Sequence, residues 1–373
     1  MSAGVRHLYV HLPFCAHRCG YCDFVTLVGR RDLHGVYVDA VIRELELEAG
    51  LLAPGGLESV YVGGGTPTFT EPAALAKLLA ALPPASEVTV EANPETVTLR
   101  LATSLRAAGV NRVSLGAQSF DPRLLGVLER RAAPDVVRRA FYHLRDACLD
   151  NISLDLIYGI PGQSPADLGR DLAEALSLSP EHLSCYELEA KPGTRFTHAW
   201  GEELSRQAEA MEGHFELVVE TLVGAGYRWY ETANFCREGR QARHNLAYWR
   251  GRDYLGVGIG AVSTVGARRW RNVPKLGAYL DALRAGERPP REVEELDERT
   301  KLVERVMLGL RLDEPLRFRD VEPAVDQDAL ERLGRLGLVR FGRDQLTLTH
   351  AGRFLGGGVT AELVSEIPAK QYN

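Results

Sequence analysis

Short runs of apolar and β-branched residues alternate, along the first half of the chain, with longer stretches in which apolar residues recur at helical spacing. The stretches 35–50 and 72–82 both have this spacing, and the second opens with Pro72 in its first turn. Strands that alternate with helices favour right-handed βαβ units and a parallel sheet. We therefore predict an α/β fold with six strands, at Leu8–Leu12, Ser59–Val62, Val88–Val90, Arg112–Leu115, Ile152–Ile157 and Leu183–Leu188.

A polar or glycine-bearing segment ends or follows each predicted strand. The carboxyl ends of parallel strands face one mouth, where α/β proteins carry out their chemistry, so we expect these segments to converge. They are the cysteine-bearing loop after Leu12, Gly63-Gly64-Gly65-Thr66-Pro67, Glu91-Ala92-Asn93-Pro94, Gly116-Ala117-Gln118-Ser119-Phe120, Asp155 with Tyr158-Gly159-Ile160-Pro161-Gly162, and Tyr186 with Glu187.

The second half of the chain is organised differently. Its patterns predict a helix over 202–223, a strand over 227–232, a glycine-rich segment over 256–266 and a linker at Pro289-Pro290 and the acidic run that follows. From Asp297 onward, two or three helices precede a β-pair, Val339–Phe341 and Gln345–Thr349, and a further helix at His350, an order similar to a winged helix. We expect three domains, with limits at 1–200, 201–290 and 291–373.

Charge and hydropathy narrow the choice of partners. The chain has 44 Lys and Arg against 50 Asp and Glu, a net charge of −6, so no global field favours nucleic acid or an anionic membrane. Residues 297–373 hold 12 basic and 13 acidic residues, which favours a packing or partner-docking module over DNA binding. Residues 1–9 carry no charged-then-apolar leader, and no apolar stretch is long enough for a membrane span, so we expect a cytoplasmic, reducing location.

Three of the six cysteines lie in one short loop with the spacing C-x3-C-x2-C, at Cys15, Cys19 and Cys22. Zinc sites use four ligands, or three and a water, and usually a second cysteine pair, which this chain lacks. Three thiolates on a cubane of four irons leave one iron open for another ligand. We therefore favour a [4Fe–4S] cluster over a zinc knuckle or three packing thiols. We expect the other three cysteines, Cys148, Cys185 and Cys236, to pack in the interior.

The strand-end residues leave two interpretations open. Three consecutive glycines either form a tight turn or let the backbone approach the polar end of a small ligand, and no phosphate-loop motif is present. Glu91, Gln118 and Asp155 either cap the helices that follow or bind a ligand with hydroxyl and amine groups. Their convergence on one mouth favours the ligand.

These residues resemble the radical S-adenosylmethionine superfamily, and within it the HemN/HemW group of oxygen-independent coproporphyrinogen dehydrogenases and heme chaperones. The matching motifs span most of residues 7–197, namely Y-V-H-L-P-F-C-A-H-R-C-G-Y-C-D-F, V-G-G-G-T-P-T, E-A-N-P-E, S-L-G-A-Q-S-F-D, D-L-I-Y-G-I-P-G-Q and P-G-T-R-F. The resemblance implies an incomplete (β/α)6 barrel followed by an accessory region and a C-terminal helical, winged-helix-like domain. It also implies that S-adenosylmethionine chelates the fourth iron and carries the hard chemistry.

Further residue roles follow from the same resemblance. It implies that Tyr9 and Tyr21 lie beside the cofactor and that Gly64, Gly65 and Thr66 contact its methionine end. It implies that Glu91, Gln118, Arg130 and Asp155 contact the rest of the molecule. Surface exposure of Arg130, unrelated to any ligand, is the alternative.

Two departures from the dehydrogenases favour the heme chaperones. Phe24 stands where the dehydrogenases have a further cysteine, and they carry an N-terminal extension, whereas 14 residues precede Cys15 here. The run His244-Asn245-Leu246-Ala247-Tyr248-Trp249 resembles the H-N-x-x-Y-W motif of HemW, which implies a heme contact at His244. Imidazole is a common axial ligand of heme, whereas a hydrogen-bonded loop histidine is the alternative. Glu129 and Ala132 replace the expected Gly and His, and Lys191 an expected Glu.

We accordingly expect a protein that binds a [4Fe–4S] cluster, S-adenosylmethionine and heme and delivers heme to acceptor apoproteins. The alternatives are an oxygen-independent coproporphyrinogen III dehydrogenase, which decarboxylates two propionates of its substrate, and a radical enzyme that opens or methylates the heme ring. A reductant for the cluster is a further expected partner. The acceptor, which can be membrane-associated, the electron donor and a homodimer are left open by the sequence.

Overall fold

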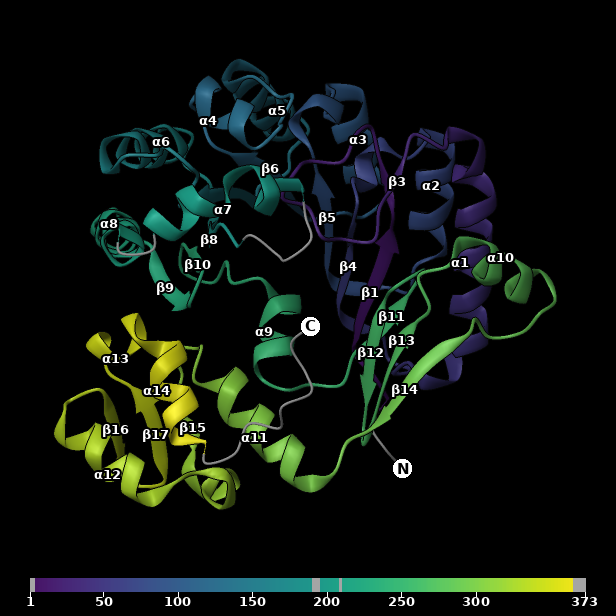
Figure 1. The fold of residues 1–373 in the computed structure, drawn as a ribbon. Coiled ribbons are helices and arrows are strands. Elements are labelled where there is room, and N and C mark those ends of the chain that lie inside the picture. The colour runs from purple at the N-terminus through teal and green to yellow at the C-terminus, as the bar shows by residue number, and fades with distance from the viewer. Residues whose placement is uncertain (1–3, 190–194, 208–209, 365–373) are drawn as a thin grey trace.

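The computed structural model describes residues 4–189, 195–207 and 210–364. All six predicted strands are present and lie side by side in parallel (Figure 1). Each is as long as predicted or longer, because the polar strand ends also pair with their neighbours. The strands are β1 (His7–Leu12), β4 (Leu57–Gly64), β5 (Ala85–Ala92), β6 (Arg112–Gln118), β7 (Ile152–Tyr158) and β8 (His182–Glu187).

The sheet contains three strands that the sequence patterns did not place in it. β11 (Leu255–Val257) extends it in parallel beside β1. At the other edge, β10 (Asn234–Cys236) and β9 (Arg228–Glu231) add antiparallel strands beside β8. The resulting order is β11-β1-β4-β5-β6-β7-β8-β10-β9, so β11 and β9 are the two edges of an open, incomplete barrel.

Helices cover the convex face of the sheet (Figure 1). On β1, the alternate residues Leu8, Val10 and Leu12 are fully buried on this face and belong to one core with Tyr37 and Val41 of the first helix. The remaining strands follow the same alternation, which places one apolar set under the helices. The covering helices are α1 (His34–Glu48), α2 (Pro72–Ala81), α3 (Leu99–Ala107), α5 (Pro134–Asp146), α6 (Pro165–Ser177) and α8 (Met211–Gly224), whereas the short α4 (Pro122–Val127) packs near the cysteine loop through Leu124.

The concave face carries the opposite alternation and is polar. His7, Tyr9 and His11 of β1 pair in register with Ser59, Tyr61 and Gly63 of β4. Across the next strands this face presents carboxylates, hydroxyls and a fully buried arginine, at Glu87, Glu91, Arg112, Ser114, Ser153, Asp155, His182 and Ser184. A parallel sheet covered by helices on both faces is apolar on both. The polar face therefore marks the interior of the barrel as a site for polar groups.

The predicted linker after Pro289 is wrong, because the acidic run forms strand β14 (Arg291–Glu295). β14 pairs with the arginine-rich β13 (Arg268–Asn272), which also pairs with β12 (Val262–Val265). Glu295 lies 3.0 Å from Arg268 and Glu294 lies 3.5 Å from Arg269 across the two strands. Cross-strand pairs of opposite charge stabilise a sheet, so the acidic residues complement a basic strand rather than extend a linker.

The helix expected over 202–223 is instead two helices, α7 (Arg195–Gln207) and α8, with residues 208 and 209 outside the described part. Two short helices complete the upstream part, α9 (Arg243–Trp249) and α10 (Leu276–Arg284). None of the described helices combines the length and apolar character that crossing a membrane requires.

The C-terminal region has an apolar cluster of its own within residues 303–364. The predicted β-pair is present as β16 (Val339–Gly342) and β17 (Gln345–Leu348), and β15 (Leu316–Arg317) pairs with the other edge of β17. The helices here are α11 (Glu298–Gly309), α12 (Gln327–Arg335), α13 (His350–Phe354) and α14 (Gly356–Leu363). The three domain limits stay predictions, and β9 to β11 of the middle region lie in the same sheet as the barrel strands.

Candidate functional site

The cysteine loop follows β1 at the mouth of the barrel. Its base is closed by β2 (Phe14–Cys15), which pairs with β3 (Leu27–Val28), and by the Gly29 N–H, which donates to the Cys15 carbonyl at 2.8 Å. Within the loop, the Cys22 N–H donates to the Cys19 carbonyl at 3.2 Å. Cys15 is buried, whereas Cys19 and Cys22 are half-buried. One thiol is thus fixed in the wall, and two are accessible at the mouth.

Residues from three other segments surround these thiols. The Thr66 hydroxyl lies 3.5 Å from Cys15 Sγ, and the Arg130 guanidinium reaches Cys19 Sγ at 3.9 Å. Asn93 joins the two, because its amide donates to Thr66 Oγ1 at 3.0 Å and accepts from Arg130 Nη2 at 2.9 Å. Arg130 is therefore not a surface arginine, and its predicted contact with the cofactor stays a prediction.

The donor set fits a four-iron cluster. Within the described ranges, no three His, Cys, Asp or Glu side chains have the geometry to hold one metal ion. A cubane sets a different requirement, since each of the three thiolates binds its own iron atom. Burial raises the pKa of Cys15 to about 11, so this thiol loses its proton when a metal binds. The Arg130 guanidinium, whose Nε is buried without a partner among the described residues, supplies positive charge beside Cys19.

Glu91 lies at the end of β5 and points into the barrel. Its carboxylate accepts hydrogen bonds from the Tyr61 hydroxyl at 2.7 Å and from the Gly64 N–H at 3.0 Å. These contacts cross to β4, so Glu91 joins two strand ends rather than capping the helix that follows. Burial and then the nearby Asp155 raise the pKa of Glu91 to about 7, against the two hydrogen bonds, which lower it.

Asp155 of β7 also lies in the interior of the barrel, near Glu91. Its carboxylate accepts from the Ser114 hydroxyl at 2.9 Å and from the Ser153 hydroxyl at 3.2 Å. Burial raises its pKa, and the serine hydroxyls and Arg112 oppose that shift. Like Glu91, it is a buried carboxylate held by neighbouring strands, so the capping alternative applies to neither.

Gln118 ends β6 in the left-handed backbone region, at φ 66°. The pairing of β6 with β7 shifts register between Gly116 and Gln118, which is a bulge. A Cβ at Gly116 would lie 2.8 Å from Gln118 Nε2, so the side chain turns back over the glycine. Bulges and positive φ at non-glycine residues cluster where a side chain is re-aimed for function.

The glycine run is required by the protein's own packing. Gly64 has φ 114°, and a Cβ there would lie 2.6 Å from the His11 ring. A Cβ at Gly65 would lie 2.6 Å from the Pro13 carbonyl oxygen, directly before the cysteine loop. The tight-turn interpretation is thus sufficient for both glycines, and a ligand contact at either one stays a prediction.

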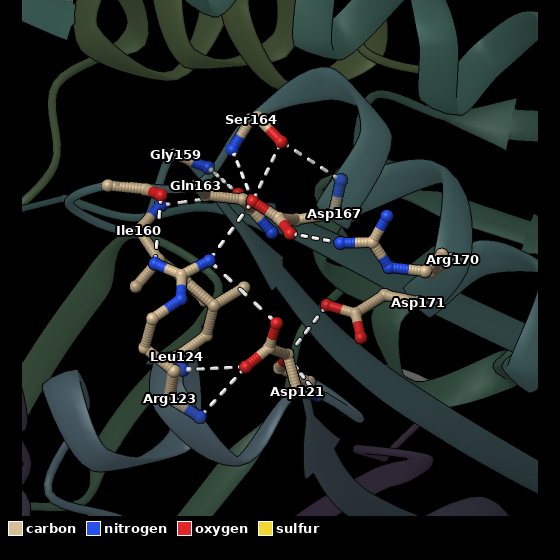
Figure 2. Close-up of polar contacts among 12 residues, drawn as sticks. Asp121, Arg123, Leu124, Gly159, Ile160, Gln163, Ser164, Asp167, Arg170 and Asp171 are labelled. Carbon is tan, nitrogen blue, oxygen red and sulfur yellow. Dashed lines mark hydrogen bonds and ion pairs between the residues drawn. The ribbon is translucent and has the colours of Figure 1, made fainter.

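Outside the mouth, a polar network holds the loops after β6 and β7 (Figure 2). Asp171 of α6 accepts from the Ser119 hydroxyl at 2.7 Å and from the Phe120 N–H at 2.6 Å. Arg123 donates to the Gly162 carbonyl at 2.9 Å and to Asp167 at 3.0 Å. The network fixes the residues that directly follow Gln118. Ser119, Phe120 and Gly162 belong to the motifs that predicted the site, whereas Asp167 and Asp171 lie outside them.

We expect Asp171→Ala to lower the free energy of unfolding by about 2–4 kcal/mol, because it leaves two buried donors without an acceptor. Urea unfolding followed by circular dichroism measures the change. Asp146→Ala, on the exposed face of α5, is the control and should change stability by less than about 0.5 kcal/mol. Equal midpoints for the two variants would show that the network does not stabilise the fold.

Tyr9 and His244 lie deeper in the barrel, below Glu91. The His244 ring stacks on the ring of Tyr61, with the two centroids 5.2 Å apart. Tyr9 also stacks on Tyr61, with the two centroids 6.2 Å apart. His244 is 1% exposed on α9, and burial lowers its pKa to about 3, so it is neutral. Its Nδ1 lies 2.9 Å from Ser59 Oγ and its Nε2 lies 2.8 Å from Tyr248 Oη. Both ring nitrogens are therefore engaged.

Three sets of residues named in the sequence analysis remain. Tyr21 is half-buried and packs on the apolar cluster of Leu124, Leu128 and Ile160 beside the cysteine loop. Lys191 and most of the P-G-T-R-F motif lie outside the described residues. Glu129 occupies the loop before Arg130 with φ 55°, a conformation that suits the glycine expected there.

Several residues of the site escaped the sequence patterns. They are Tyr61, which holds Glu91, and Glu87 and Arg112 at the lower end of the barrel. Asn93, which holds Arg130, lies in a predicted strand-end segment, but no role was predicted for it. The signal that could have found them is the period-two alternation within each strand. It places Glu87 on the same face of β5 as Glu91, and Tyr61 on the same face of β4 as Gly63.

The comparisons with known proteins agree with this geometry. A sequence profile of the Radical SAM superfamily matches residues 9–175. A solved structure titled as the coproporphyrinogen III oxidase HemN of Escherichia coli, a radical SAM enzyme, superposes with a TM-score of 0.79, covering 98% of this chain and 91% of that one at 23% identity. The fold and the cysteine loop together define a radical S-adenosylmethionine protein, a class that implies a [4Fe–4S] cluster and S-adenosylmethionine.

Relatives that match nearly the whole chain identify the family within this class. The protein named heme chaperone HemW in Mycobacterium tuberculosis is 37% identical over 369 residues, covering 96% of this chain and 94% of that protein. The protein of the same name in Bacillus subtilis is 32% identical over 384 residues, covering 97% of this chain and 100% of that protein. The chain belongs to the HemW family.

Proposed function

We propose that this protein binds heme and delivers it to acceptor apoproteins, with a [4Fe–4S] cluster and S-adenosylmethionine at the mouth of its barrel. The observation that carries the proposal is the similarity to proteins named heme chaperone over nearly the whole chain, including the region that follows the barrel. Phe24 at the position of the dehydrogenases' further cysteine also supports it.

Each part of the mouth has a proposed task. Cys15, Cys19 and Cys22 hold three irons, and the cluster and its cofactor supply redox chemistry when bound. Glu91 and Asp155 accept hydrogen bonds from the hydroxyl and amine groups of S-adenosylmethionine, and Gln118 is aimed at the same space by its bulge. Arg130, beside Cys19, offsets negative charge from the thiolates and from the ligand's carboxylate. The predicted contacts of Tyr9, Tyr21, Gly64, Gly65 and Thr66 complete the set.

The test is heme retention by anaerobically reconstituted protein after gel filtration, read by absorption spectroscopy. We expect the wild type to keep about one heme per chain without consuming porphyrin, and His244→Ala to lose most of it if the motif histidine is needed for heme binding. His350→Gln, an exposed histidine of the C-terminal region, controls for stray imidazole ligation. A wild type that keeps no heme but converts coproporphyrinogen III would replace this proposal with the dehydrogenase.

A further inference from the structure

Two of the three cysteines in the loop have a hydrogen-bonding group of the barrel beside their sulfur atoms. The buried Thr66 hydroxyl, in the segment after β4, lies 3.5 Å from Cys15 Sγ. Arg130 Nη1 lies 3.9 Å from Cys19 Sγ. A guanidinium can only donate, but a hydroxyl can donate or accept. The distance between Thr66 and Cys15 alone therefore does not give the direction of that hydrogen bond.

The side chain of Asn93, in the segment after β5, settles this direction. The Arg130 guanidinium has only donors, so the amide atom that lies 2.9 Å from its Nη2 is the oxygen, Oδ1. The amide nitrogen Nδ2 is then the atom 3.0 Å from Thr66 Oγ1, and it donates to that oxygen. Since Thr66 accepts from Asn93, its own proton is left to donate to Cys15 Sγ.

The backbone of Asn93 is held by its own segment and by the segment after β4. The Thr96 hydroxyl and N–H donate to the Asn93 carbonyl at 2.7 and 3.0 Å, and Thr96 Oγ1 lies 2.6 Å from Thr68 Oγ1. Pro94 follows Asn93 and disfavours a helical backbone before it, and the observed φ of −91° and ψ of 140° are extended. The amide is therefore presented from a fixed base.

Asn93 also aims the guanidinium of Arg130. Arg130 Nη2 donates both to Asn93 Oδ1 at 2.9 Å and to the Gly116 carbonyl at 2.8 Å. Because the guanidinium is planar and rigid, holding Nη2 at two acceptors fixes the direction of Nη1, which reaches Cys19 Sγ. One amide thus links a neutral donor at one cysteine sulfur to a charged donor at another.

Hydrogen bonds to the sulfur atoms of an iron–sulfur cluster change its reduction potential. Reduction makes a cluster more negative, so a donor at a thiolate stabilises the reduced form more than the oxidised form. Losing such a donor makes reduction harder and lowers the potential. Residues that orient the groups around metal ligands commonly matter nearly as much as the ligands themselves.

We propose that Asn93 is a positioning residue that sets the reduction potential of the cluster, because it directs the Thr66 hydroxyl to Cys15 and the Arg130 guanidinium to Cys19. The inference rests on the proposed function, since it concerns the cluster assigned to the three cysteines, and adds a residue that acts through two others. An aspartate in place of Asn93 would offer only acceptors. The Thr66 hydroxyl would then donate to the new carboxylate and turn away from Cys15.

The test is a potentiometric titration of the reconstituted full-length protein before S-adenosylmethionine is added, followed by electron paramagnetic resonance of the reduced cluster. Asn93→Asp should lower the equilibrium constant for one-electron reduction at least about tenfold, which is a midpoint shift of about 59 mV. Thr66→Val should also lower the midpoint, whereas Thr66→Ser keeps the hydroxyl and should stay near the wild type. Gln327→Glu, the same amide-to-acid change on the exposed start of α12, is the matched control and should not shift it.

Iron analysis and circular dichroism check that each variant is folded and carries about four irons. If Asn93→Asp takes up fewer, Asn93→Leu replaces it. Leucine removes the amide without adding a charge, so the midpoint should fall less than with aspartate but below that of the wild type.

A double-mutant comparison separates positioning from a simple charge effect. Asn93→Asp acts partly through Thr66, so its shift should be smaller in the Thr66→Val background than in the wild type. Equal shifts in the two backgrounds would mean that the added carboxylate acts by its charge alone, and an unchanged midpoint in Asn93→Asp would mean that it has no effect. Either result overturns the positioning role while the proposed function stands. A wild type that takes up no cluster instead contradicts the proposed function itself.

Discussion

Replacing Cys19 with alanine should abolish the brown, broadly absorbing cluster after anaerobic reconstitution. The structure holds the three cysteines in one loop closed by β2 and β3, so no other described thiol can take the place of the missing one without opening that base. Two thiolates leave a second iron open, and the cluster is lost or incomplete. Iron and sulfide analysis should fall from about four irons per chain to near background.

Cys148→Ser is the control for this experiment, because Cys148 lies outside the loop and is exposed, so its predicted packing in the interior is wrong. It should reconstitute as the wild type does. A full iron content in Cys19→Ala would contradict a cluster held by these three thiolates. Arg130→Lys adds a finer comparison, since it keeps the charge beside Cys19 but loses the planar fork that also binds Asn93 and the Gly116 carbonyl.

Glu91→Gln should weaken the binding of S-adenosylmethionine to the reconstituted protein about 10–100-fold at pH 8, the usual range for a lost hydrogen bond to a charged group. In the wild type, the affinity should fall as the pH is lowered through about 7. The sign follows from the raised pKa of Glu91, which burial brings to about 7. Below that pH the carboxyl is protonated and loses acceptor capacity for the ligand's hydroxyl and amine groups.

Calorimetric titrations from pH 6 to 8 measure both effects. Glu91→Gln cannot titrate, so its affinity should stay flat over this range. Glu46→Gln, on the exposed side of α1, should keep the wild-type pH profile. A wild-type affinity that does not change between pH 6 and 8 would show that Glu91 does not receive these hydrogen bonds.

The barrel strands and the cysteine loop could be predicted from the sequence because both depend on local patterns. Apolar runs, turn residues and cysteine spacing are each read within a few residues. The strands β10 and β11 could not be predicted in the same way. Each is three residues long and is held by pairing with β8 and β1, which lie far away in the chain.

Two misassignments have a common cause. The linker predicted at the acidic run of β14 and the single helix predicted over 202–223 were both inferred only from the residues within each segment. The acidic run becomes a strand because Arg268 and Arg269 lie opposite it, a complement that composition alone does not show. The position of His244 is a similar case. Its motif implies a ligand contact, but Ser59 comes to its Nδ1 only through the tertiary fold, whereas Tyr248 reaches its Nε2 from one turn further along the same helix.

The strand β5 carries a residue for each end of the barrel. Glu87 anchors α9, and Glu91 stands at the mouth, four residues further along. At about 3.3 Å per residue, the strand separates these two positions by roughly 13 Å. Because β5 is paired on both sides in the middle of the sheet, the distance between Glu87 and Glu91 is fixed. The start of α9, which carries the H-N-x-x-Y-W motif, is therefore held at a fixed distance from the carboxylate at the mouth.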